Sequence, residues 1–201
     1  MEFTLSMILS SEERGTGRLH GANLADAVRH VRESGYVILE DALPHTWVDA
    51  VGKAFEEASA ECPPPEDGRG AVPIRYEDPF LDPFAVENPW GLQIIKAMMG
   101  GDIWSIFPYH TNTSWPGAGM QNIHRDTKHL FPDFPVALPP SLLIIHIPLV
   151  DFTDENGSTG NGYFGAGIGS ERTDMDGDGL ADINLDSLLT FHRSHKKLVT
   201  V

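Results

Sequence analysis

Cysteine is almost absent from this sequence, and basic residues are scarce. Cys62 is the only cysteine among 201 residues, which excludes an intramolecular disulfide and a cysteine-ligated zinc site. Lysine and arginine number 14 against 29 acidic residues, for a formal charge of −15. A field of that sign repels phosphate backbones and anionic lipid. We therefore expect no nucleic-acid or membrane partner, and a small-molecule substrate fits the charge better.

Long apolar runs are missing as well. No stretch approaches the ~20 residues that a transmembrane helix needs. Residues 1–11 contain Glu2 and lack the basic start and small-residue cleavage site of a signal peptide. These absences predict a cytoplasmic protein. A hydrophobic content of 41% is typical of a folded chain, and we expect residues 1–201 to form a single domain.

Helical spacing dominates the first half of the chain, and strand-like patterns dominate the second. Apolar residues at helical spacing predict helices over residues 23–33, with Asn23 as the N-cap, and over 45–60. A third helix is predicted from Asn88-Pro89 to Gly100-Gly101, with Leu92, Ile95 and Met99 facing inward. A short buried strand is predicted at 36–39. Later strands are predicted at residues 103–109, 120–124 and 141–150, the last in the core, and Pro116-Gly117 predicts a turn. Helices followed by strands favour an α+β or helix-flanked, mainly β domain.

The triplet His124-Arg125-Asp126 carries the main chemical prediction. In a strand, residues two apart point to the same side, with Cα atoms roughly 6.6 Å apart. An imidazole and a carboxylate so placed can bind one cation. They supply two corners of the facial triad that leaves iron(II) open positions for a co-substrate and dioxygen. A surface histidine beside an ordinary aspartate is the alternative reading of the same triplet.

The order of motifs resembles the phytanoyl-CoA dioxygenase family. The resemblance rests on Gly35-Tyr36-Val37-Ile38-Leu39 after a helix, on His124-Arg125-Asp126, and on Pro148-Leu149-Val150-Asp151 running into Glu155-Asn156-Gly157. It covers about residues 20–159. It implies a double-stranded β-helix, a jelly-roll or cupin-like fold with flanking helices, and oxidation of a small organic substrate with iron(II), 2-oxoglutarate and dioxygen. It also implies that His124 and Asp126 are iron ligands, and it suggests Gln121 as a co-substrate or substrate contact.

The end of the chain departs from that family. The family's third ligand is a distal histidine, for which His195 is the first candidate and His192 the second. The family's arginine for the 2-oxoglutarate carboxylate would fall beyond Val201, so the β-helix is expected to be incomplete at this end. A catalytically inactive or truncated oxygenase-like binding protein therefore remains an alternative.

A second candidate metal site lies in the atypical Gly/Asp-rich segment 160–186. Alternating aspartates followed by a glycine place oxygen ligands around one point, as calcium loops do. The segment weakly resembles an integrin-type FG-GAP calcium loop, which would make the chain a calcium-binding adhesion fragment. A metal-free acidic loop is the alternative. The candidate calcium ligands are Asp174, Asp176, Asp178 and Asp182.

Overall fold

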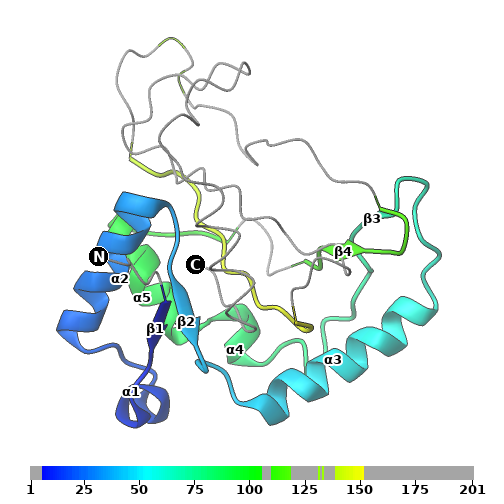
Figure 1. Ribbon diagram of the computed structural model, residues 1–201, viewed down its shortest axis with the longest axis horizontal. Coiled ribbons are helices and arrows are strands. Elements are labelled where there is room, and N and C mark those ends of the chain that lie inside the picture. The colour runs from blue at the N-terminus through cyan, green and yellow to red at the C-terminus, as the bar shows by residue number, and fades with distance from the viewer. Residues whose placement is uncertain (1–5, 106–109, 119–130, 132, 134–138, 152–201) are drawn as a thin grey trace.

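A computed structural model describes residues 6–105, 110–118, 131, 133 and 139–151 of the chain. Helices α2, α3 and α5 are the longest elements, and two pairs of short strands accompany them (Figure 1). In chain order the elements are β1 (Ser6–Ile8), α1 (Ser11–Thr16), α2 (Gly21–Ser34), β2 (Ile38–Glu40), α3 (His45–Ala60), β3 (Arg69–Gly70), α4 (Pro83–Val86), α5 (Pro89–Met99) and β4 (Thr113–Ser114).

The predicted double-stranded β-helix is wrong. Over the described residues the structure is about 41% helix and 9% strand, with two sheets of two strands each. β1 and β2 pair in parallel, with Met7 opposite Leu39. β3 and β4 pair antiparallel, with Gly70 opposite Thr113. Short apolar runs predict strands, but such runs also occur in extended chain that packs on helices without a regular ladder.

The three predicted helices are confirmed. The prediction for α3 agrees with its bounds, and α2 extends the predicted 23–33 by a few residues. α5 begins as predicted, with the Asn88 side chain accepting a hydrogen bond from the backbone N–H of Gly91 at 2.9 Å and proline in the first turn. Asn23, the predicted cap of α2, lies inside that helix, whose N-cap is His20. The buried strand expected at 36–39 is β2.

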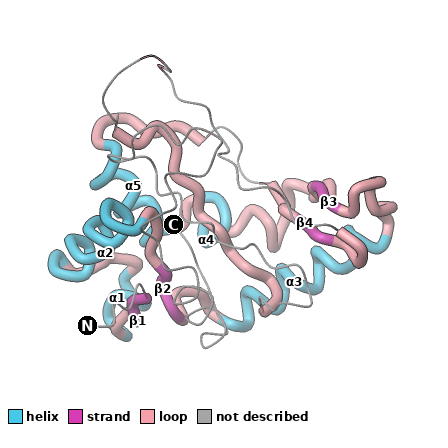
Figure 2. The backbone as a smooth tube through the Cα atoms, turned by 45° about the horizontal axis from the view of Figure 1, so that its top comes forward, coloured by secondary structure: helices cyan, strands magenta, loops and turns pink. Residues whose placement is uncertain are grey.

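The core lies between α2, α5 and the β1–β2 pair. α2 and α5 pack side by side, and both views place the two strands next to them (Figures 1 and 2). On α5 the buried face is not the predicted Leu92, Ile95 and Met99. Of these only Ile95 is buried, and the helix is rotated so that its other buried residues are Trp90, Gly91, Ile94 and Met98. The buried cluster comprises Leu9, Leu19, Ala27, Val31, Val37, Leu39, Ala42, Leu43, Trp90, Ile94, Ile95 and Met98.

The apolar segment 141–150 crosses this core as extended chain, with a single bridge at His146. Alternate residues Leu143, Ile145 and Ile147 pack against the core, whereas Ile144 is exposed. Ile145 lies so close to α5 that a Cβ on Gly91 would meet its Cδ1 atom at 2.5 Å. The prediction of a core position was therefore sound for these alternate residues, whereas the prediction of a regular strand was not.

α3 leads away from this core toward the β3–β4 pair (Figure 2). Residues 103–105, the described part of another predicted strand, form no strand either. Among the helices of the described residues, none is both long enough and apolar enough to span a membrane.

Candidate functional site

The residues predicted to bind iron and calcium lie outside the described part of the chain. This applies to Gln121, His124, Asp126 and the two C-terminal candidates His192 and His195. It also applies to the proposed calcium ligands Asp174, Asp176, Asp178 and Asp182. The structure therefore neither brings these side chains together nor separates them.

The described chain before His124 ends at Ala118, and backbone hydrogen bonds hold residues 113–115 in place. β4 pairs with β3, and the backbone N–H of Trp115 donates to the carbonyl of Gly68 at 2.8 Å. The turn predicted at Pro116-Gly117 is present, and Gly117 has a φ of 92°, a conformation that favours glycine. Nearby, the Thr111 hydroxyl contacts the backbone of Val72. The approach to the predicted metal motif is thus tied to the loop after α3.

Among the described residues, no group of three or more histidine, cysteine, aspartate or glutamate side chains could hold a metal ion. In the described part of the chain, His20 and His45 each lie near a carboxylate, and both pairs are exposed. His20 lies 3.6 Å from Glu12, and His45 lies 3.6 Å from Asp41. Neither pair has the third donor that a structural metal site requires.

One carboxylate in the described region is fully buried. Glu13 accepts hydrogen bonds from the backbone N–H of His20 at 2.7 Å, from the side chain of Asn23 and from both the backbone and the hydroxyl of Ser10. Burial alone would raise the pKa of Glu13, but these donors outweigh it and lower the pKa to about 2. A carboxylate held ionised by so many donors joins the start of α1 to the start of α2 and is not available as a general acid or base.

Glu13 was missed by the sequence predictions, although a signal for it exists. Ser10 and Glu13 form a capping box, in which the N-cap serine and the glutamate three residues later bond each other's backbone. The spacing Ser-x-x-Glu before a helix is a recognised start signal. α1 and its capping glutamate could therefore have been predicted.

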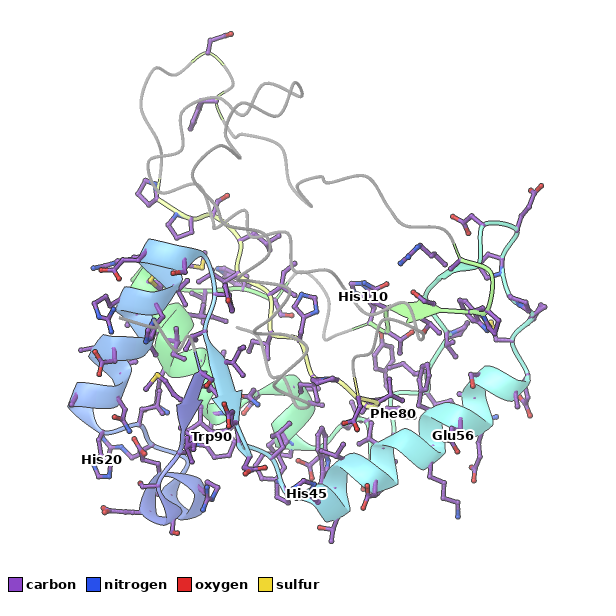
Figure 3. All side chains as sticks on the ribbon, in the orientation of Figure 1. His20, His45, Glu56, Phe80, Trp90 and His110 are labelled. Carbon is purple, nitrogen blue, oxygen red and sulfur yellow. The ribbon has the colours of Figure 1, made fainter. Side chains whose placement is uncertain are left out.

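Three aromatic rings from α3, α4 and α5 form a connected cluster. Phe84 stacks on Trp90 with centroids 6.0 Å apart and an interplanar angle of 5°. Trp47 meets Phe84 edge-on at 5.7 Å. The indole N–H of Trp90 donates to the carbonyl of Glu13 at 3.1 Å, which fixes this ring against α1. Figure 3 labels Trp90 beside the two strands and His45 at the start of α3.

A pocket of about 380 Å³ borders this aromatic cluster. Its wall combines the side chains of Arg14, Asp41 and His45 with Leu43, Phe84 and Trp90. No motif in the sequence pointed to these residues, because they come from four separate segments and become neighbours only through the fold.

No family model matches the sequence.

Proposed function

We propose that this protein is an iron(II)- and 2-oxoglutarate-dependent oxygenase that oxidises a small organic molecule. The observation that carries the proposal is the triplet His124-Arg125-Asp126, whose imidazole and carboxylate have the donor chemistry that iron(II) takes in facial-triad sites. The resemblance to the phytanoyl-CoA dioxygenase family supports it. The double-stranded β-helix is not part of this proposal, because the described residues form helices and two-stranded sheets.

In this function His124 and Asp126 hold the metal, and a C-terminal histidine, His195 or His192, completes the set. Bound iron(II) supplies the oxidation of substrate coupled to conversion of 2-oxoglutarate and dioxygen into succinate and carbon dioxide. The chain's own contribution is to position the ligands and exclude water. In this proposal Gln121 contacts the co-substrate or the substrate. The excess of acidic residues favours a substrate without strong negative charge.

The test begins with anaerobic protein, to which iron(II) and then 2-oxoglutarate are added. We expect a visible charge-transfer band on co-substrate binding and release of succinate after admission of oxygen. His124→Ala and Asp126→Ala should abolish both signals, because each removes a side chain that coordinates the metal directly. The matched controls are His129→Ala and Asp133→Ala, which should keep them.

Two outcomes would contradict the proposal. A folded wild-type protein that shows neither the band nor succinate is not an oxygenase of this class. Metal binding that is lost in His124→Ala, without any 2-oxoglutarate binding in the wild type, would favour the oxygenase-like binding protein. Metal analysis of the purified protein distinguishes iron from the calcium expected of the Asp174–Asp182 loop.

A further inference from the structure

The pocket beside Trp90 combines opposite charges with an aromatic wall. It opens where α1, the β2–α3 connection and the starts of α4 and α5 meet. Its volume of about 380 Å³ falls in the range of small-molecule sites. None of the described residues that line it is among those proposed to bind iron.

Arg14 supplies the positive charge of the pocket, and its position is fixed. The Nη1 group of Arg14 donates to the carbonyl of Leu9 at 2.6 Å, and Nη2 lies 3.5 Å from the hydroxyl of Ser11. A guanidinium carries five N–H donors in a rigid fork, so these two contacts leave others for a ligand. A fork of this kind suits a carboxylate, which can accept two parallel hydrogen bonds.

Asp41 supplies the negative charge from another segment. It follows β2 directly and has a φ of 50°, which is unusual for a residue other than glycine and is tolerated best by aspartate and asparagine. Its carboxylate lies 3.6 Å from the imidazole of His45, and both side chains are more than half exposed. The pocket thus presents the guanidinium of Arg14 and the carboxylate of Asp41, with the imidazole of His45 beside that carboxylate.

The apolar wall is pre-organised. Trp90 is 1% exposed, stacks on Phe84 and is held by its hydrogen bond to the carbonyl of Glu13. Leu43 adds an aliphatic surface and belongs to the buried core. Phe84 is only partly buried, so a ligand can cover its ring, which the buried side chains already hold in place.

The geometry points to this pocket as a binding site for a small zwitterion with an apolar body, of the class of an α-amino acid with an apolar side chain. The ligand carboxylate pairs with Arg14, the ligand ammonium pairs with Asp41, and the apolar side chain lies against Phe84, which stacks on Trp90. A simple anion would be repelled by Asp41, and a simple cation would be repelled by Arg14. The zwitterion satisfies both charges.

The test uses the full-length, metal-free protein and L-phenylalanine as the probe. Binding is followed by the indole N–H signals of the four tryptophans in ¹⁵N-labelled protein. We expect the Trp90 signal to shift saturably, whereas the signal of Trp104, which is 89% exposed and does not line the pocket, stays unchanged. Phenylpropionate, which lacks the ammonium, and phenethylamine, which lacks the carboxylate, should each bind at least about tenfold more weakly.

Charge-neutral variants identify the two ends of the ligand. Arg14→Gln should weaken L-phenylalanine about tenfold and remove its advantage over phenethylamine. Asp41→Asn keeps a residue that tolerates the positive φ at this position. It should remove the tighter binding of L-phenylalanine relative to phenylpropionate. The matched controls Arg18→Gln and Asp49→Asn change exposed residues outside the pocket and should bind as the wild type does.

Three results would overturn the inference. One is absence of any Trp90 shift in the folded wild type. Another is equal binding of the three probes, which would indicate an apolar surface without charge recognition. The third is unchanged selectivity in Asp41→Asn, a variant of an exposed side chain that leaves the core intact. Circular dichroism of each variant confirms that the fold is retained.

Discussion

Glu13 is the residue on which the N-terminal part of the structure depends most. Its carboxylate accepts hydrogen bonds from three different residues and is shielded from solvent. We expect Glu13→Gln to lower the free energy of unfolding by about 2 kcal/mol, because an amide cannot accept all of these bonds and leaves buried donors unpaired. Urea unfolding followed by circular dichroism measures the change.

The neighbouring glutamate provides the control for this prediction. Glu12 is exposed and contacts only His20 at 3.6 Å among the ion pairs of the described residues. Glu12→Gln should change the unfolding free energy by less than about 0.5 kcal/mol. Equal effects of the two substitutions would show that the hydrogen bonds of Glu13 do not stabilise the fold.

The lowered pKa of Glu13 also predicts a pH dependence. The pKa of Glu13 is about 2 in the folded state, against an ordinary value of 4.5 for a glutamate side chain. The unfolded chain therefore takes up this proton first as the solution is acidified. The stabilisation is complete above about pH 4.5 and is lost as the pH falls toward about 2. Glu13→Gln should flatten this part of the stability profile, and a profile identical to that of the wild type would contradict the assignment.

The buried side chain of His30 predicts a second loss of stability, at a higher pH than the loss that Glu13 causes. It is 7% exposed on α2, and burial, assisted by the charge of Arg29, lowers its pKa from the ordinary value of 6.5. The unfolded chain binds the proton more readily, so stability falls as the pH drops below about 6.5 and continues to fall until the folded-state pKa is reached. His30→Gln should remove this part of the loss in urea unfolding, whereas the exposed control His20→Gln should retain it.

At the scale of elements, two glycines of the first helix have opposite roles. Gly17 ends α1 with a φ of 66°, and a Cβ there would lie 3.3 Å from that of Pro89. Gly15 lies within α1, and nothing stands within 4 Å of a Cβ at this position. We expect Gly17→Ala to destabilise the protein by about 1 kcal/mol, and Gly15→Ala to stabilise it by up to about 1 kcal/mol. Thermal unfolding of the pair tests the assignment, and a change of the same sign in both would refute it.

Element prediction succeeded where local signals agree with the fold. The 3.6-residue spacing of apolar positions identified α2 and α3, and the Asn-Pro start with a glycine end identified α5. It failed for residues 141–150, whose alternate apolar residues pack on helices without a regular ladder. A strand requires a neighbouring strand to which its backbone is hydrogen-bonded. A run of apolar residues does not show which segment that neighbour is. β1 was missed for the same reason, because its pairing with β2 spans the whole of α1 and α2.

The best-supported residues of the predicted iron site are close together along the chain, whereas the residues of the observed pocket are far apart along it. His124 and Asp126 are two residues apart, so their relation can be read along the chain, and they stay a prediction. Arg14, Asp41 and Trp90 meet only after α1, β2 and α5 have packed together. No pattern along the sequence anticipates such a meeting. The capping box of Ser10 and Glu13, by contrast, was readable and was overlooked.

At the scale of the whole molecule, the charge of −15 predicts a response to salt. Repulsion among like charges opposes the compact state, and the Debye length shortens from about 30 Å at 0.01 M to about 10 Å at 0.1 M salt. We therefore expect the Tm to rise between these two sodium chloride concentrations. Scanning calorimetry measures the shift, and a Tm that falls or stays constant would show that attractive ion pairs dominate.

The bonds between α5 and the N-terminal segment have a consequence for synthesis on the ribosome. Trp90 bonds the carbonyl of Glu13 across 77 positions, and Gln93 bonds Leu19 and Gly17 across 74 and 76. A nascent chain that has emerged only through α3 has α1, α2 and both parallel strands but lacks the helix that covers them. Its apolar surface stays open to chaperones until α5 leaves the exit tunnel, so the rate of chain elongation between the emergence of α3 and that of α5 sets how long the exposure lasts.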